Sequence, residues 1–275
     1  MNHEKSFTKI ELYCMTIDKF TIINQLGSGS IGTVYKAMYN KTGEVYALKF
    51  VNTPNTKKIL NSSKITRNFD HPNVMKTYGY FVDSQDEKLC IVSILEYIDG
   101  MDLYDFSGEK STSYIMAILP SIMCQVISGL KYIHSLGLVH RDIKLENIII
   151  TPDNEAKIID FDFISLKDSD ILCGTPYYMA PELGKGHNAD ERSDVWSLGV
   201  VIYTLLVGDY PFDGESDTEI MVNSIRATLK EYKIPRLYRS LIKGMLEKDP
   251  DKRTDLVEAF MILKGLCPIQ KQDGV

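Results

Sequence analysis

Cysteine is sparse and unpaired in this sequence. An odd, dispersed set of cysteines excludes a disulfide framework and a cysteine-ligated zinc site, and is typical of free thiols in a reducing compartment. We therefore expect an intracellular protein, either cytoplasmic or nuclear. The chain of 275 residues contains five cysteines, no two of them in a CxxC pair: Cys14, Cys90, Cys124, Cys173 and Cys267.

Long apolar segments are also lacking. The first ten residues, MNHEKSFTKI, have no apolar core of the kind that a signal peptide needs. The longest apolar run, residues 195–207, is interrupted by Ser197, Gly199 and Thr204. It is shorter than the ~20 residues that span a bilayer. We interpret it as a buried helix and expect no membrane insertion.

The sequence has no long block of basic residues. Its formal net charge is −6, which argues against a nucleic-acid-binding protein, because such proteins neutralise phosphates with clustered lysine and arginine. Hydrophobic residues make up 44% of the chain and charged residues 25%, a balance typical of a globular protein with a sizeable core. The sequence shows no repeat and no low-complexity segment.

The first hundred residues show mainly strand patterns. Five segments combine β-branched and aromatic residues, and turn sequences such as 40–43 and 83–86 separate them. One helical segment, 57–67, interrupts the series. The predicted strands are 20–26, 33–40, 45–51, 74–82 and 88–97.

Beyond Asp99-Gly100 the hydrophobic periodicity becomes helical. Strands first and helices later favour an α+β fold with two lobes, and the boundary between them falls near residues 96–99. The predicted helices include 114–135, 193–207, 217–227 and 238–246.

Most of the chemical information lies in residues 140–147, HRDIKLEN, which stand between a helical pattern and the strand-like run 148–150. Phosphoryl transfer requires a carboxylate that orients the attacking hydroxyl and accepts its proton. It also requires a lysine near the γ-phosphate and an amide oxygen that helps to hold Mg²⁺. Asp142, Lys144 and Asn147 supply these three groups within one short loop.

A second motif is rich in glycine. Residues 27–32, GSGSIG, fit the pattern GxGxxG, which on its own also occurs in dinucleotide-binding folds. The residues that follow, 33–39, alternate like a strand, and no Lys-Ser/Thr pair follows Gly32, which excludes a Walker A loop. We therefore expect a hairpin whose glycines let backbone N–H groups approach phosphates.

These motifs resemble those of eukaryotic protein kinases, whose catalytic loop has the pattern H-R-D-L-x-x-x-N. KLEN, CGTP, SLGVVIYTLL and PFDG look most like the calcium/calmodulin-dependent and AMP-activated branch of the serine/threonine kinases. The matching segments stand in the family's order: GSGSIG at 27–32, VYALK at 45–49, HRDIKLEN at 140–147, DFD at 160–162 and CGTPYYMAPE at 173–182.

The resemblance implies a bilobal protein-kinase-like fold, with a small, mostly antiparallel β lobe at about 20–97 and a larger, mostly helical lobe at about 98–266. Residues 1–19 would then be an N-terminal extension, read as a short polar lead, and 267–275 a C-terminal tail. The implied activity is transfer of the γ-phosphoryl group of ATP, with Mg²⁺, to a serine or threonine hydroxyl of a protein substrate. The motifs say nothing about oligomeric state.

The same resemblance assigns the site residues. The catalytic residues would be Asp142, Lys144, Lys49 and Thr175, and the metal ligands Asn147 and Asp160. Thr175 is expected to bond to Asp142 and Lys144, and Arg253 to form a structural pair with Glu182. The nucleotide would be bound by Leu26, Gly27, Ser28, Gly29, Ser30, Ile31, Gly32, Thr33, Val34, Ala47, Lys49, Glu96 and Ile98.

One family residue is missing. The helical glutamate that normally pairs with the strand lysine falls on Ser62 here, and no Asp or Glu lies between Lys49 and Asp70. The alternatives for Lys49 are contact with Ser62, with Asn61 or with Asp160. This departure keeps a second interpretation open, a pseudokinase or weakly active ATP-binding module. A small-molecule phosphotransferase ranks last, because such enzymes lack the GTP…APE segment.

Three further positions carry expectations. Asp162 replaces the glycine of Asp-Phe-Gly, which predicts a less mobile segment without loss of metal binding. Ile171 occupies the place of a threonine that related kinases phosphorylate. Asp168 and Asp170 would supply Arg141 with negative charge instead, so we expect constitutive activity; the alternative is that both aspartates face solvent.

Substrate preference is predicted from two acidic residues. Glu146 and Asp102 match places where basophilic kinases receive arginine, and bidentate arginine–carboxylate contacts are selective. We expect Arg or Lys two to three residues before the target Ser/Thr. The alternative is that both acids are simply solvated.

Overall fold

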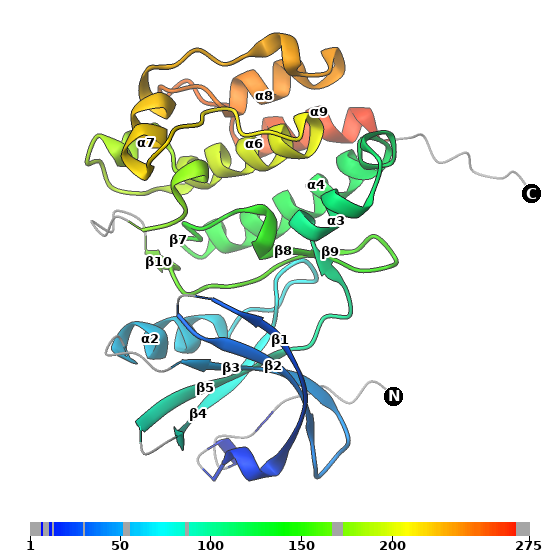
Figure 1. Cartoon of the computed structure of the whole chain (residues 1–275), viewed down its shortest axis with the longest axis vertical. Helices are drawn as coiled ribbons and strands as arrows, with labels where there is room; N and C mark the ends of the chain where they lie inside the picture. Colours follow the sequence, from blue (N-terminus) through cyan, green and yellow to red (C-terminus); the bar gives the residue numbers. More distant parts are fainter. Residues whose placement is uncertain are drawn as a thin grey trace, which may run out of the picture. The chain divides into compact units, whose positions relative to one another are not determined.

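The chain folds into two compact units, Met1–Asp99 and Gly100–Val275 (Figure 1). The first unit is built on an antiparallel sheet and the second is mainly helical, which confirms the predicted α+β class. This computed structural model describes residues 7, 11–12, 14–29, 31–51, 56–85, 88–166 and 173–267.

The N-terminal unit contains a five-stranded sheet in the order β1-β2-β3-β5-β4, with every neighbouring pair antiparallel. The predicted strands correspond to these five, but β4 is shifted: it begins at Thr77 instead of residue 74 and extends to Gln85, into the predicted turn at 83–86. Before it, the N–H of Lys76 donates to the Glu96 carboxylate at 3.0 Å instead of joining the ladder. The strands are β1 (Phe20–Ser28), β2 (Thr33–Tyr39), β3 (Val45–Val51), β4 (Thr77–Gln85) and β5 (Lys88–Glu96).

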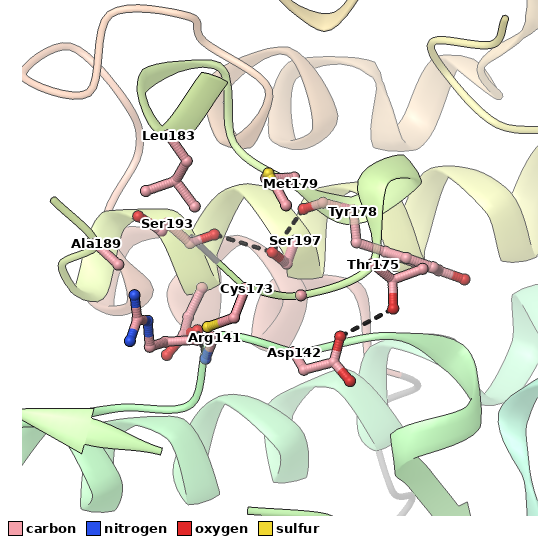
Figure 2. Close-up of a pocket in the computed structure, with 12 residues that line it drawn as sticks. Arg141, Asp142, Cys173, Thr175, Tyr178, Met179, Leu183, Ala189, Ser193 and Ser197 are labelled. Carbon is pink, nitrogen blue, oxygen red and sulfur yellow. Dashed lines mark hydrogen bonds between the residues drawn. The ribbon is translucent and has the colours of Figure 1, made fainter. Parts of the chain in front are cut away.

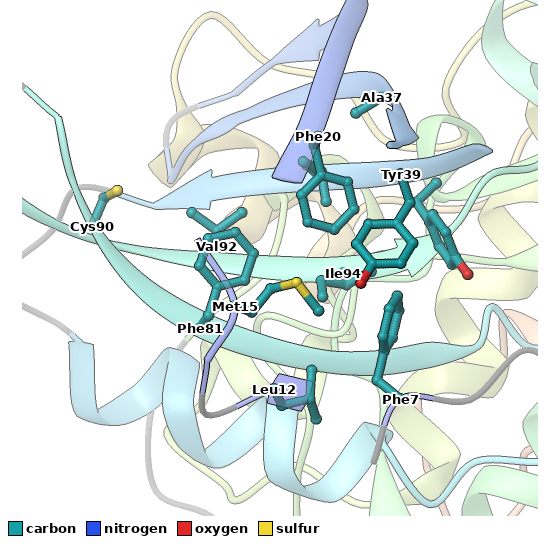
Figure 3. Close-up of a cluster of buried hydrophobic side chains, with 12 residues drawn as sticks. Phe7, Leu12, Met15, Phe20, Ala37, Tyr39, Phe81, Cys90, Val92 and Ile94 are labelled. Carbon is teal, nitrogen blue, oxygen red and sulfur yellow. The ribbon is translucent and has the colours of Figure 1, made fainter. Parts of the chain in front are cut away.

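The core of this unit includes side chains from before the first strand (Figure 3). Phe7, Leu12 and Met15 are all buried, and the Phe7 ring lies 5.4 Å from that of Tyr39. Leu12 fills the space above Gly79, where an added Cβ would lie 2.6 Å from its Cδ1. These three residues of the segment predicted to be a polar N-terminal extension are therefore part of the hydrophobic core.

The helix predicted at 57–67 is present as α2 (Thr56–Thr66). It packs against β4 and β5. Ile59 is buried in a cluster with Val51 and Ile91. The neighbouring turn is polar but also buried, and the Ser63 hydroxyl lies 3.2 Å from that of Ser93 on β5. Small hydroxyl side chains thus face the sheet on this side of α2.

The C-terminal unit is built around two long helices, α4 and α6, which pack against each other. Of the helices in the described part of the chain, α4 is the one that by length and composition could span a membrane, but half of its apolar window is buried inside the unit. Its Pro120 is also buried, so we interpret α4 as a core helix. The helices are α3 (Leu103–Glu109), α4 (Thr112–Ser135), α5 (Pro181–Gly184), α6 (Glu191–Val207), α7 (Asp217–Arg226), α8 (Arg239–Met245) and α9 (Leu256–Leu266).

Short strands in the same unit flank the loop at 140–147 and precede Asp160. Strands β6, β8 and β9 form one sheet, and β7 pairs with β10 in another. The Gln125 side chain of α4 fixes the β8–β9 turn, because its amide donates to the Asn154 carbonyl and accepts from the Ala156 N–H, both at 2.9 Å. The strands are β6 (Met101–Asp102), β7 (Leu138–Val139), β8 (Ile148–Ile150), β9 (Ala156–Ile158) and β10 (Ser165–Leu166).

Candidate active site

The loop at 140–147 connects β7 to β8 and ends in a short 3₁₀ helix, η2 (Leu145–Asn147). It is closed on itself by Asn147, whose Nδ2 donates to the Asp142 carbonyl at 2.8 Å and to Asp142 Oδ2 at 3.0 Å. Both side chains are buried. Because the amide nitrogen is turned toward Asp142, the amide oxygen is the atom of Asn147 that can serve a cation.

Asp142 lies in contact with both Thr175 and Lys144. The sequence predicted that Thr175 would bond to each of the other two, and Figure 2 shows its bond to Asp142. The Thr175 hydroxyl donates to Asp142 Oδ1 at 2.9 Å, and Lys144 Nζ lies 2.9 Å from Asp142 Oδ2. Lys144 in turn donates to the Thr175 hydroxyl at 3.1 Å. Carboxylate, ammonium and hydroxyl therefore form a closed triangle with each side at hydrogen-bond distance.

A second aspartate, Asp194 on α6, holds the backbone of the same loop. Its Oδ2 accepts the N–H of His140 and its Oδ1 the N–H of Arg141, both at 2.9 Å. Its Oδ2 also lies 2.8 Å from Nε2 of His134 on α4. Arg141 has a φ of +72°, a conformation that costs a non-glycine residue free energy. The Asp194 carboxylate compensates for this strain in the loop.

The electrostatics of Asp194 follow from these contacts. Complete burial by itself would raise the pKa of its carboxyl group. The hydrogen bond and charge of His134, together with the N–H of Arg141, outweigh that effect and lower the pKa below its ordinary value of 3.8. Asp194 is therefore ionised in the folded protein at neutral pH.

This lowered pKa predicts a pH dependence of stability. A carboxyl group with a lower pKa in the folded state stabilises that state above its unfolded pKa, and the stabilisation is lost as the pH falls through the folded value. We expect Asp194→Asn to lower the free energy of unfolding by about 2–3 kcal/mol near neutral pH. The difference from wild type should shrink below the ordinary pKa of 3.8. Urea unfolding of both proteins across this range would measure it, and a difference that stays constant with pH would contradict the assignment.

Asp160 follows β9, and its position is fixed through the residue before it. The Ile159 N–H donates to the Asn147 carbonyl at 2.9 Å, and the Ile159 carbonyl lies 3.1 Å from Nε2 of His140. Asp160 itself has a φ of +60°, which aspartate tolerates better than most residues. The catalytic loop and the Asp160 backbone are thus one connected structure.

Asp162 occupies the place of the family's glycine without needing a glycine conformation. Positive φ in this segment falls at Asp160, and Asp162 is not among the described residues with positive φ. Its N–H donates to Asp160 Oδ1 at 3.3 Å, and the residue is buried. Asp162 therefore bears none of the backbone cost that a positive φ imposes on a residue other than glycine.

The segment 173–182 lies over the catalytic loop (Figure 2). Gly174 has a φ of +113°, and a Cβ there would lie 2.7 Å from the Arg141 carbonyl, so the close approach requires glycine. The Ser197 hydroxyl of α6 donates to the Tyr178 carbonyl at 2.7 Å. The cavity between this segment and α6 measures about 10 Å³, which admits at most one water molecule.

This segment is anchored at its end by a buried ion pair. Arg253 Nη1 and Nη2 lie 2.7 Å from Oε1 and Oε2 of Glu182, a bidentate arrangement, which confirms the predicted pair. The guanidinium also donates to the carbonyls of Glu247 and Arg192 and lies 5.2 Å from the ring of Trp196. Both carboxylate oxygens of Glu182 are thus met by a charged donor.

In the N-terminal unit, the glycine-rich motif forms the predicted hairpin between β1 and β2. The Gly29 N–H donates to the Gly32 carbonyl at 2.9 Å across the turn. At Gly32 an added Cβ would lie 2.1 Å from the Phe50 carbonyl, whereas around Gly27 and Gly29 the space is open. Ser30, also predicted to bind the nucleotide, lies outside the described residues.

Lys49 lies on β3 beside other predicted nucleotide-binding residues. It is the register partner of Val34 on β2 and of Ser93 on β5, and directly opposed residues share a face of the sheet. Ala47 stands two positions earlier and so faces the same way. Val34, Ala47 and Lys49 therefore lie on one face, as adenine and phosphate recognition would require.

Ser62, which stands where the family has a glutamate, forms its side-chain hydrogen bond within helix α2. Ser62 is buried, and its Oγ donates to the Ile59 carbonyl at 2.9 Å. Asn61 is exposed. The neighbouring Ser63 lies 3.2 Å, hydroxyl to hydroxyl, from Ser93, which is the strand partner of Lys49.

The predicted adenine-binding segment follows β5. The Glu96 N–H donates to the Lys76 carbonyl at 2.9 Å, and Lys36 Nζ donates to the Tyr97 hydroxyl at 2.9 Å. Tyr97 also donates to Asp99 at 3.1 Å. These bonds fix the segment that contains Glu96 and Ile98 at the end of the sheet.

Comparison with known proteins identifies the family to which the chain belongs. The family model described as "Protein kinase domain" matches residues 20–262. The chain belongs to the protein kinase family. Members of this family use ATP and Mg²⁺ and act on protein substrates.

Individual kinases show similar sequences over most of this chain. It is 35% identical to Aurora kinase of Schizosaccharomyces pombe over 263 residues, covering 89% of the chain and 70% of that protein. It is 31% identical to serine/threonine-protein kinase PLK4 of Nematostella vectensis over 256 residues, covering 88% of the chain and 26% of that protein. Calcium-dependent protein kinase 5 of Plasmodium falciparum is 39% identical over 207 residues, which cover 72% of the chain and 35% of that protein. The chain thus spans about a quarter to a third of two of these relatives.

A kinase needs a magnesium site, and the donor set suits one. The structure offers the Asn147 amide oxygen and the Asp160 carboxylate, whose backbones are connected through Ile159. Oxygen donors of this kind are those that Mg²⁺ prefers, and Mg²⁺ commonly takes only one or two protein ligands beside phosphates. Among the described residues no cluster of three or more His, Cys, Asp and Glu could hold a metal.

The site residues that sequence reasoning missed act on the kinase loop from a distance. Asp194 and His134 come from α6 and α4, and Gln125 fixes the hairpin that precedes Asp160. An aspartate in the first turn of a predicted helix was the available signal for Asp194. No local pattern marks the other two, because their partners are backbone groups far along the chain.

Proposed function

We propose that this chain is an ATP-dependent serine/threonine protein kinase. The observation that supports it most is the triangle of Asp142, Lys144 and Thr175, in which each side lies between 2.9 and 3.1 Å. A pseudokinase has no physical need for this arrangement together with Asn147 and Asp160. The contacts among Asp142, Lys144 and Thr175 thus favour an active kinase over a pseudokinase that only binds ATP.

Each group has a distinct task in the proposed reaction. Asp142 orients the substrate hydroxyl and accepts its proton, and Lys144 places a positive charge beside the transferred phosphoryl group. Thr175 holds both side chains in position. Asn147 and Asp160 would hold Mg²⁺, which when bound neutralises charge on the β- and γ-phosphates.

The N-terminal unit supplies the proposed nucleotide-binding groups. The open space around Gly27 and Gly29 lets backbone N–H groups approach phosphate oxygens. Lys49 would pair with the α- and β-phosphates, and Val34 and Ala47 would cover the adenine ring. The backbone of Glu96 and Ile98 would bond to its edge.

A phosphotransfer assay tests this proposal. The purified chain is incubated with γ-labelled ATP, Mg²⁺ and a library of peptides that each contain one serine, threonine or tyrosine. We expect label on serine and threonine peptides and none on tyrosine peptides, and no transfer when the metal is removed with EDTA. ATP binding without transfer to any peptide would instead support the pseudokinase.

The site predicts a preference for basic substrates through Glu146. Glu146 is exposed beside the catalytic residues, whereas Asp102 caps α3 by accepting the Asp105 N–H at 2.9 Å, and burial raises its pKa. We expect Arg two or three residues before the target to raise kcat/KM, and Glu146→Gln to lower that gain about threefold to tenfold. Glu258→Gln, at another exposed glutamate of this unit, should leave it unchanged. Preference for acidic or proline-directed sites would contradict the prediction.

Regulation yields a further expected result. Asp168, Ser169, Asp170 and Ile171 lie outside the described residues, while the Arg141 guanidinium donates to the Ser165 hydroxyl at 3.0 Å. We expect phosphatase-treated protein to be fully active, because aspartate supplies a permanent, if weaker, negative charge. Replacing Asp168 and Asp170 together by asparagine should lower kcat.

The control for this prediction is Ser169→Ala. Its kcat should stay within about twofold of the wild-type value, a change in activation free energy well below the 1.36 kcal/mol that corresponds to tenfold. Incubation with upstream kinases, followed by activity measurement and phosphosite mapping, tests the same point. Strong activation by phosphorylation of Ser165 or Ser169 would overturn constitutive activity.

A further inference from the structure

The stretch that leads from α7 into α8 carries charge opposite in sign to that of the whole chain (Figure 1). Residues 230–243, KEYKIPRLYRSLIK, include five basic residues and one acidic residue, whereas the chain has a formal net charge of −6. We call this stretch the basic segment. It runs through two short 3₁₀ helices, η4 (Glu231–Lys233) and η5 (Arg236–Tyr238), into α8. Its basic residues are Lys230, Lys233, Arg236, Arg239 and Lys243.

Two large apolar side chains of the basic segment are exposed. Tyr232 is 79% exposed and Leu237 60%, and no large hydrophobic side chain among the described residues is more exposed than Tyr232. Single exposed apolar residues are common on protein surfaces. These two, however, share one short segment with arginine, and tyrosine and arginine are enriched at the energetic centres of protein interfaces. The basic segment is therefore a candidate binding surface.

The backbone below these side chains is fixed to the rest of the unit. Lys243 Nζ lies 3.0 Å from Glu231 Oε1, and Arg239 Nη2 donates to the Ile234 carbonyl at 3.2 Å. The hydroxyl of the buried Tyr238 donates to a carbonyl of α4 at 3.1 Å. A partner that binds here therefore meets a surface that is already ordered, which reduces the entropy cost of binding.

The cations of the basic segment differ in what they contact. Lys233 Nζ lies 2.8 Å from Asp209, and Lys243 is held by its own ion pair. Lys230 and Arg236 are exposed, and among the described residues neither side chain has a hydrogen bond or an ion pair. Lys230 stands two positions before Tyr232, and Arg236 directly precedes Leu237. Each exposed apolar side chain thus has a cation close by in the sequence whose charge is available to a partner.

We propose that the basic segment is a docking surface for an acidic segment of a partner protein. Apolar side chains of the partner would pack on Tyr232 and Leu237, and its carboxylates would pair with Lys230 and Arg236. The planar guanidinium of Arg236 suits bidentate pairing with a carboxylate. Charge complementarity of this kind speeds association and selects the partner. None of these four residues belongs to the groups that would transfer phosphate.

A nucleic acid fits the same surface less well. Binding that depends on phosphates needs several free cations, and two of the five in the basic segment already pair within the chain. The net charge of −6 also repels a polyanion. Leu237 would have no apolar counterpart on a sugar-phosphate backbone. The exposed apolar side chains therefore favour a protein segment as the occupant.

The test measures binding by the full chain without ATP, so its result is independent of phosphotransfer. The probes are short labelled peptides in which aspartate and glutamate surround one leucine or phenylalanine. Two matched sets replace the acids by their amides, or the apolar residue by serine. We expect the acidic apolar peptides to bind in fluorescence anisotropy, and the Kd of each matched set to be at least about tenfold higher. Absence of binding by every acidic apolar peptide would overturn the proposal.

Matched variants locate the binding surface. Arg236→Gln and Tyr232→Ser should each raise the Kd of the best acidic peptide about tenfold. Lys131→Gln and Tyr104→Ser alter an exposed lysine and an exposed tyrosine elsewhere in the same unit and should leave the Kd unchanged. An unaltered Tm shows that each variant folds. The proposal is wrong if all four variants bind alike, or if a single-stranded oligonucleotide of equal charge binds the wild type more tightly than the peptides do.

Discussion

Replacing Asp142 by asparagine is expected to lower kcat by about 10²–10⁴-fold at saturating ATP. The variant removes the group that accepts the substrate proton, and it also removes the charge that Lys144 pairs with at 2.9 Å. Because asparagine has the same shape, it can still accept a hydrogen bond from Thr175, so the fold should remain. Circular dichroism and Tm would confirm folding, and single-turnover assays would separate the chemical step from binding.

The matched control for Asp142 is Asp153→Asn, at an exposed aspartate in the β8–β9 turn of the same unit. This variant should keep wild-type kcat. Full kcat in the Asp142→Asn protein would show that the carboxylate is not the proton acceptor. An equal loss in both variants would point to a general effect of charge and count against the assigned role.

The second large effect is expected at the buried ion pair. Arg253→Met should lower the free energy of unfolding by about 3–5 kcal/mol, because it leaves the buried Glu182 carboxylate without its bidentate partner. Methionine keeps most of the side-chain volume against Trp196, so loss of packing contributes little. Chemical denaturation of both proteins at neutral pH would measure the difference.

Two further variants separate charge from packing. The double variant Glu182→Leu with Arg253→Met removes both charges and should recover much of the lost stability, since the remaining cost is not that of an unpaired ion. Asp251→Asn breaks an exposed contact with Arg192 on the same side of α6 and should cost less than about 1 kcal/mol. A double variant that is no more stable than Arg253→Met would show that the cost at this position arises from packing.

The sequence predicted the parts of the site that lie within single loops. Asp142, Lys144 and Asn147 could be found because phosphoryl transfer restricts both residue type and spacing over eight positions. Thr175 could be placed beside them only through the family resemblance, since its contacts cross more than thirty residues. Asp194 shows the limit, because a buried carboxylate that bonds to backbone groups leaves no repeated pattern in the sequence.

The strands and long helices were predictable because hydrophobic periodicity extends over several turns or alternations. The predicted helices did not include α3, a seven-residue helix that contains glycine and serine and depends on its Asp102 cap. Phe7, Leu12 and Met15 were read as part of a polar lead, because three apolar residues at irregular spacing resemble a solvated tail. Their burial becomes apparent only in the folded protein, where all three pack against the same sheet.

The burial of Phe7, Leu12 and Met15 shows that the packed unit of this protein begins before the segment that matches the family model. The family match begins at residue 20, which marks where ancestry can be recognised. In the part of the chain that the structure describes, the packing begins earlier, at Phe7. A fragment cut at the recognisable boundary would leave Tyr39, Tyr46 and Phe81 without these apolar neighbours and would remove the Leu12 side chain that packs on Gly79. An expression boundary for this kinase therefore has to be chosen from the packing and not from the family match.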